Sequence, residues 1–165
     1  MPISMHSSCI PLFALMFENM LKWLDKAQAH ADAHNFDAQL FLDTKLAPDM
    51  VPLLRQVQLA TDTATTWVSR LTGSEMKGWE YSEVTLDDAR MRIRRTIAYL
   101  KSIDPSSING AEGREIVHPH RFGELRIDGE NYLQLLTANL FFHITIVYAL
   151  LRQAGVDLGK DDYLG

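Results

Sequence analysis

The chain has 165 residues, of which 47% are hydrophobic and 22% charged, which is enough apolar sequence to bury the core of one globular domain. Its net charge of −5 argues against a general nucleic-acid binder, because such proteins neutralise phosphates with a basic surface. The start of the chain lacks the features of a signal peptide, and no apolar run approaches the roughly 18 residues of a membrane span. We therefore expect a single cytoplasmic domain over residues 1–165, with no nucleic-acid or membrane partner.

Cys9 is the only cysteine, so no disulfide can form within the chain. It stands among the apolar residues Ile10, Leu12 and Phe13. Free cysteine in such surroundings usually behaves as a small hydrophobic residue, so we interpret Cys9 as part of the core rather than as a nucleophile.

Four segments carry apolar residues at spacings of three and four, the period of a helix with one buried face. Asp49 is a suitable N-cap for the second segment, and Thr85 with Asp88 resembles a capping box before the third. Asp128 can cap the fourth segment. The predicted helices cover residues 7–34, 49–72, 85–102 and 129–154.

Residues 114–127 break the helical pattern. Polar and apolar residues alternate here on both sides of Arg121-Phe122-Gly123, which predicts a small β-hairpin. Four helices with one apolar face each must pack together to bury those faces. The expected fold class is therefore all-α, an antiparallel four-helix bundle with a small β-hairpin between helices three and four.

The third predicted helix is the most basic part of the chain. Arg90 and Arg94 share one face of this helix, but the other arginines do not. We therefore interpret the arginines as a solvated surface rather than as a phosphate-binding stripe. These residues are Arg90, Arg92, Arg94 and Arg95, followed by Lys101.

Polar residues occupy positions where the helical period predicts inward-facing apolar ones. Asn139 and His143 stand four apart on the fourth helix, in a predicted inward row that also includes Leu135, and they share one face. Gln58 belongs to a similar row on the second helix. Because a buried, unpaired polar group costs about 1–3 kcal/mol, these side chains should meet partners. Two interpretations stay open: core residues that fix the helix register, or an interior pocket for a ligand or metal.

Common catalytic motifs are missing from the sequence. There is no glycine-rich phosphate loop, paired-cysteine metal site, Gly-x-Ser-x-Gly elbow or His-Glu-x-x-His motif. The enzyme classes that depend on those motifs are therefore excluded.

The sequence contains five distinctive stretches, at residues 45–50, 55–58, 139–143, 150–152 and 162–165. Together they resemble a family of uncharacterised bacterial proteins, domain of unknown function 1993. That family is similar to the DinB/YfiT-like superfamily of four-helix bundles, many of which are metal-dependent and some of which are thiol transferases.

The resemblance implies a position for a metal site. Typical superfamily members hold a divalent metal with one histidine on the second helix and two at i, i+4 on the last. Carried over by position, these histidines fall on Gln58, Asn139 and His143, so only one is retained. One imidazole and two amides make a poor site for zinc or nickel, and we predict no bound metal.

Two functions are compatible with these observations. The first is a bundle that binds a small molecule without metal, or that has a structural role, with Gln58, Asn139 and His143 lining an interior pocket. The second is a thiol-transferase-type enzyme with a weak or altered site for nickel, zinc or manganese. The resemblance also implies a homodimer, for which apolar surface would come from Trp23, Phe41, Trp67 and Trp79.

Overall fold

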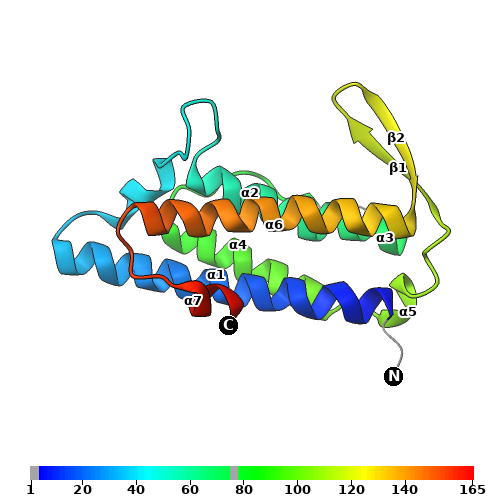
Figure 1. Ribbon diagram of the computed structural model, residues 1–165, viewed down its shortest axis with the longest axis horizontal. Coiled ribbons are helices and arrows are strands. Elements are labelled where there is room, and N and C mark those ends of the chain that lie inside the picture. Colours follow the sequence, from blue (N-terminus) through cyan, green and yellow to red (C-terminus); the bar gives the residue numbers. More distant parts are fainter. Residues whose placement is uncertain (1–3, 75–77) are drawn as a thin grey trace.

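The computed structural model describes residues 4–74 and 78–165. Figure 1 shows long helices lying side by side, as the sequence predicts. The helix in the second position of the bundle is continuous, because α2, a π-helical turn η2 and α3 follow one another in helical conformation. The bundle consists of α1 (Met5–His34), α2 (Leu53–Asp62), η2 (Thr63–Trp67), α3 (Val68–Thr72), α4 (Leu86–Lys101) and α6 (Gly129–Gln153).

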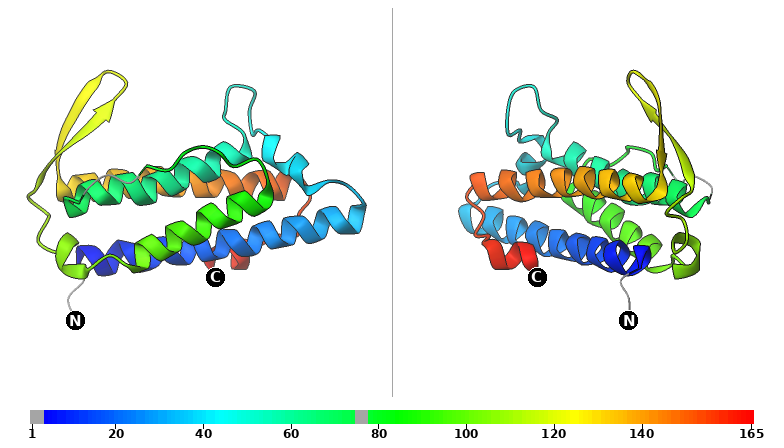
Figure 2. Two further views of the ribbon diagram at one scale, coloured as in Figure 1. Left: turned by 180° about the vertical axis from the view of Figure 1, so that it is seen from behind. Right: turned by 45° about the vertical axis from the view of Figure 1, so that its right-hand side comes forward.

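The closest helix pairs are α1 with α4 and α2 with α6, and each pair is antiparallel (Figures 1 and 2). The helices α2 and α4, although consecutive in the bundle, run in the same direction. This is possible because the chain between them returns along the bundle. Residues 78–85, which we call the strap, form most of the described part of this connection and contain no helix or strand.

Helix boundaries follow the predicted capping signals closely. The Thr85 hydroxyl accepts a hydrogen bond from the Asp88 backbone while the Asp88 carboxylate accepts one from the Thr85 backbone, which confirms the capping box of α4. Asp128 caps α6 through the backbone N–H of Asn131. A capping box at Ser4 and Ser7 starts α1 two residues before the predicted position.

The start of the second helix differs from the prediction. Asp49 is not an N-cap, because α2 begins at Leu53 with Pro52 in the N-cap position. A residue that precedes proline is disfavoured in the α region, so Pro52 keeps Val51 out of a helix. A short 3₁₀ helix, η1 (Ala38–Asp43), precedes this segment and was not predicted.

The hairpin between α4 and α6 is confirmed. Strands β1 (Glu115–His120) and β2 (Gly123–Asp128) pair antiparallel, with Glu115 opposite Asp128. Figure 1 shows the hairpin extending away from one end of the bundle. Two further short helices were not predicted, α5 (Pro105–Ile108) and α7 (Lys160–Leu164).

The core contains two of the aromatic residues that were expected to supply dimer surface. Trp23 and Phe41 are buried within the chain, so their assignment to spare surface is wrong. The indole of Trp23 donates a hydrogen bond to the Asp162 carbonyl at 2.8 Å and stacks on Tyr163, because α7 folds back over α1. Cys9 is also buried, and burial raises the pKa of its thiol to about 12, so that it stays protonated.

The helix α6 has no charged residue between Glu130 and Arg152. By length and composition alone it could cross a membrane. It packs here against α1 and α2, and only part of its circumference is buried. The buried stripe comprises Tyr132, Leu136, Leu140, Ile144, Val147, Leu150 and Leu151.

Candidate functional site

Asn139 and His143 lie at the edge of the buried stripe of α6, half-buried against α2. Nδ1 of His143 lies 2.8 Å from the amide oxygen of Gln56, and the amide nitrogen of Asn139 donates to the Thr63 hydroxyl at 2.8 Å. The inward row predicted for this helix is displaced, since Leu135 is exposed and Leu140 is buried instead. The two polar residues therefore reach α2 from the side of α6 rather than from the centre of its inner face.

Gln58 has different partners. Its amide nitrogen donates to the Glu83 carboxylate at 2.8 Å, and its amide oxygen accepts from Arg55 at 3.2 Å. Positions 56 and 58 are about 200° apart around a helix, so Gln58 faces the strap while Gln56 faces α6. Among residues 4–74 and 78–165, no hydrogen bond joins any two of Gln58, Asn139 and His143 directly. Their sharing one pocket stays a prediction.

His143 is held as a neutral imidazole. Burial, together with the nearby positive charge of Arg55, lowers its pKa to about 4. Because the amide oxygen of Gln56 can only accept, Nδ1 of His143 carries the proton and donates it. Nε2 then keeps its lone pair at neutral pH, without a hydrogen-bond partner in the described part of the chain.

The donor groups at these positions do not suit a divalent metal. The Gln58 oxygen is occupied by Arg55, and the amide nitrogens of Gln58 and Asn139 are donors without metal-binding lone pairs. Only the imidazole of His143 is a good ligand, and the charge of Arg55 opposes a second cation beside it. The described residues also contain no group of three histidine, cysteine, aspartate or glutamate side chains that could hold a metal. Gln58, Asn139 and His143 therefore do not supply the three imidazoles of the superfamily metal site.

Arg92 is the centre of a buried ionic network beside Gln58. Its side chain runs from α4 toward the strap and is almost fully buried. The guanidinium donates to the Asp62 carboxylate at 2.6 Å, to the Glu83 carboxylate at 2.8 Å, to the Thr61 hydroxyl at 2.6 Å and to the Glu80 carbonyl at 2.9 Å. These bonds tie α2, the strap and α4 together.

The interpretation of the arginines as a solvated face is thus wrong for two of them. Arg90 and Arg92 are buried, whereas Arg94 and Arg95 are exposed. Arg90 pairs with Asp25 and Asp87 at 3.0 and 2.7 Å. Buried guanidinium groups are tolerated because carboxylates from other parts of the chain compensate their charge.

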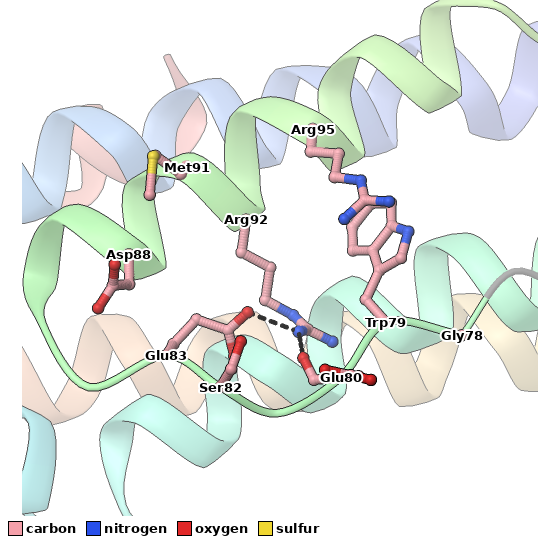
Figure 3. Close-up of a pocket in the computed structure, with 9 residues that line it drawn as sticks. All are labelled: Gly78, Trp79, Glu80, Ser82, Glu83, Asp88, Met91, Arg92 and Arg95. Atoms are coloured by element: carbon pink, nitrogen blue, oxygen red, sulfur yellow. Dashed lines mark hydrogen bonds and ion pairs between the residues drawn. The ribbon is translucent and has the colours of Figure 1, made fainter.

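The strap and α4 enclose a pocket of about 450 Å³, within the usual size range for small-molecule sites. Arg92 and Glu83 form part of its wall, so Gln58 lies directly behind it, bonded to Glu83. Figure 3 shows these side chains. The full lining comprises Gly78, Trp79, Glu80, Ser82, Glu83, Asp88, Met91, Arg92 and Arg95.

Five charged side chains line this pocket, and among the described residues two of them form an ion pair while Glu80, Asp88 and Arg95 do not. Arg92 and Glu83 are paired with each other and with residues behind the pocket. Arg95 has no carboxylate partner among the described residues, and its guanidinium lies over the Trp79 indole, 4.4 Å from the ring centroid. The Glu80 carboxylate also lacks a hydrogen bond or ion pair within residues 4–74 and 78–165. A ligand can therefore meet unpaired charges here without breaking the network that holds the strap.

Sequence reasoning missed this pocket because its parts come from separated segments. No periodic pattern marks the strap, and Trp79 was assigned to a dimer surface. The available signal was the density of charged and aromatic residues at 79–83, Trp-Glu-Tyr-Ser-Glu, just before the arginine-rich helix.

A crystal structure of a DinB family member protein from Shewanella denitrificans is similar to this chain. The TM-score is 0.90 and the sequence identity 36%, over 97% of this chain and 91% of the other. No curated protein matches the chain. Residues 5–164 match the family described as "Domain of unknown function (DUF1993)". The chain therefore belongs to the DUF1993 family, with a DinB-like fold.

Proposed function

We propose that this protein is a cytoplasmic small-molecule-binding bundle that acts without a metal at the superfamily position. The observation that carries the proposal is the pocket between the strap and α4, with its buried ionic wall and its unpaired charged rim. Preorganised polar groups around a cavity favour ligand binding, because little side-chain ordering remains to be done when the ligand arrives.

The alternative is an enzyme of the thiol-transferase type. One observation favours it: His143 is neutral and oriented by Gln56, and its Nε2 has no hydrogen-bond partner among the described residues, which is the state of a metal ligand. The other two superfamily positions supply no further ligand, so the proposal without metal accounts for more of the site.

The experiment combines a metal analysis with a binding screen. Protein purified without a histidine tag is analysed for bound metal and titrated with zinc, nickel and manganese. A library of small polar molecules is then screened by NMR through the indole N–H signal of Trp79, identified with Trp79→Phe. The buried Trp23, whose indole bonds to the Asp162 carbonyl, is the internal control.

We expect library members that shift the Trp79 signal and leave the Trp23 signal in place, and no stoichiometric metal. A library without any molecule that shifts Trp79 would contradict the proposal. Tight metal binding that is lost in His143→Ala would favour the enzyme instead.

A further inference from the structure

The helix α4 presents opposite charges at the two ends of its pocket-lining face. Four residues of α4 line the pocket: Asp88, Met91, Arg92 and Arg95. The last three are spaced three, four and seven positions after Asp88, so all four lie on one face of the helix. Seven residues correspond to about 10 Å along the helix axis. Figure 3 shows Asp88 and Arg95 on opposite sides of Arg92.

At the carboxylate end of the pocket, Asp88 can still accept hydrogen bonds from a ligand. Oδ2 of Asp88 accepts from the backbone N–H groups of Val84 and Thr85, at 3.1 and 2.9 Å, and Oδ1 has no partner in the described chain. Hydrogen bonds from Thr85 and Val84 hold the pKa of Asp88 below its usual value, so the group is charged at neutral pH.

The guanidinium end is oriented by an aromatic ring. The Arg95 guanidinium carbon lies 4.4 Å from the Trp79 ring centroid, close enough for a cation–π contact, and its N–H groups have no hydrogen-bond acceptor among residues 4–74 and 78–165. A guanidinium fork of this kind suits a carboxylate or phosphate. The lining also includes the Met91 thioether and the Trp79 ring, which offer apolar contact. Arg92 and Glu83 lie between the two ends (Figure 3).

We propose that the pocket selects a zwitterionic ligand whose anionic group binds Arg95 and whose cationic group binds Asp88. This inference rests on the proposed function, since it names the ligand class of the same pocket. Arg92, Glu83 and Asp62 are left out of the selection, because Arg92 already binds the other two. Glu80 is the other carboxylate of the lining that is unpaired within the described chain, and Asp88→Asn distinguishes it from Asp88 as the partner of the cationic group.

The test compares three probes of one length: 7-aminoheptanoic acid, heptanoate and heptylamine. Dissociation constants come from NMR titration of the Trp79 indole signal. We expect the zwitterion to bind about 10-fold more tightly than either singly charged probe, since each end adds a charge-assisted hydrogen bond.

Three variants identify the two ends. Arg95→Gln should remove the advantage of the zwitterion over heptylamine, and Asp88→Asn should remove its advantage over heptanoate. The asparagine keeps an oxygen for the backbone of Thr85, and Arg95 is exposed, so the first variant tests the inference whether or not the second folds. The matched control is Arg94→Gln, an exposed neighbour that does not line the pocket.

The outcomes separate the two proposals. If none of the three probes and no library member shifts Trp79, the proposed function fails. If ligands bind there but the singly charged probes bind as tightly as the zwitterion, or if Arg94→Gln acts like Arg95→Gln, only the inference of a zwitterionic ligand is overturned.

Discussion

Across the contact of α6 with α2, Nδ1 of His143 donates a hydrogen bond to the amide oxygen of Gln56. The imidazole is therefore part of the helix packing, whatever chemistry its other nitrogen serves.

The first prediction is a pH dependence of stability. The pKa of His143 is about 4 in the folded protein, below its ordinary value of 6.5, so the unfolded chain binds more protons between these values. The contribution of the neutral His143 to the free energy of unfolding is fully present above about pH 6.5 and is lost as the pH drops toward 4. Urea unfolding at several pH values should show this slope, and His143→Gln should reduce it. An equal slope in the variant would contradict the assignment.

The second prediction concerns the removal of the same side chain. His143→Ala leaves the Gln56 amide oxygen without its donor at the α2–α6 interface. We expect a loss of about 1–3 kcal/mol in the free energy of unfolding at pH 7, measured with urea. His34→Ala is the control, because its ring is exposed and its Nδ1 contacts only the His30 carbonyl.

Arg92 is expected to be the most sensitive polar residue in the chain. Arg92→Met leaves Asp62 and Glu83, both largely buried, without their cation. Breaking a buried pair in this way costs about 3–5 kcal/mol. Thermal unfolding monitored by circular dichroism should show a large decrease in Tm for Arg92→Met and almost none for Arg94→Met. Similar values for both variants would show that the network contributes little.

Cys9 should be inert in the folded protein. Burial raises its pKa to about 12, and its Sγ lies 3.0 Å from the Met5 carbonyl. An aromatic disulfide reagent at pH 8 should label the thiol only as fast as the protein opens, with full labelling in denaturant. Rapid labelling of the native protein would show that this part of α1 opens locally.

We expect the predicted homodimer to form through an exposed apolar surface of α6. One exposed stripe of α6, at spacings of three and four, contains Leu135, Ala138, Phe142 and Thr145, and Phe142 is 52% exposed. Since the helix has no charge between Glu130 and Arg152, a second copy can pack there without burying an ion. Light scattering should give a dimer at micromolar concentration. Phe142→Glu should give a monomer, whereas the exposed Leu40→Glu should not; a wild-type monomer would refute the prediction.

The sequence predicted those features that depend on neighbours in the chain. The capping signals at Thr85 and Asp128 were correct, because a cap and its helix lie within a few residues. The burial of Arg92 could not be predicted, since its partner Asp62 is 30 residues away and no periodic pattern marks the pair.

The candidate site was likewise predicted only where it depends on residues close together in the chain. Helical spacing correctly placed Asn139 and His143 on one face of α6, but their partners Gln56 and Thr63 were missed. The π-helical turn η2 begins at Thr63, where the Thr63 hydroxyl bonds back to the Leu59 carbonyl at 2.9 Å. Both partners lie on the α2–η2 helix, and the period of α6 alone does not show which residues of that helix it will contact.

The parallel course of α2 and α4 has a consequence for how this fold can vary. One wall of the pocket is a connection without helix or strand, and the opposite wall is a regular helix. Connections tolerate substitution and changes of length better than packed helices do. Relatives that keep the Arg92 network can therefore exchange Trp79, Glu80 and Ser82 for other residues and acquire new ligand preferences while the bundle stays intact. Substitutions in the strap can reshape the pocket, whereas Asp88, Arg92 and Arg95 belong to the packed helix α4 and vary less freely.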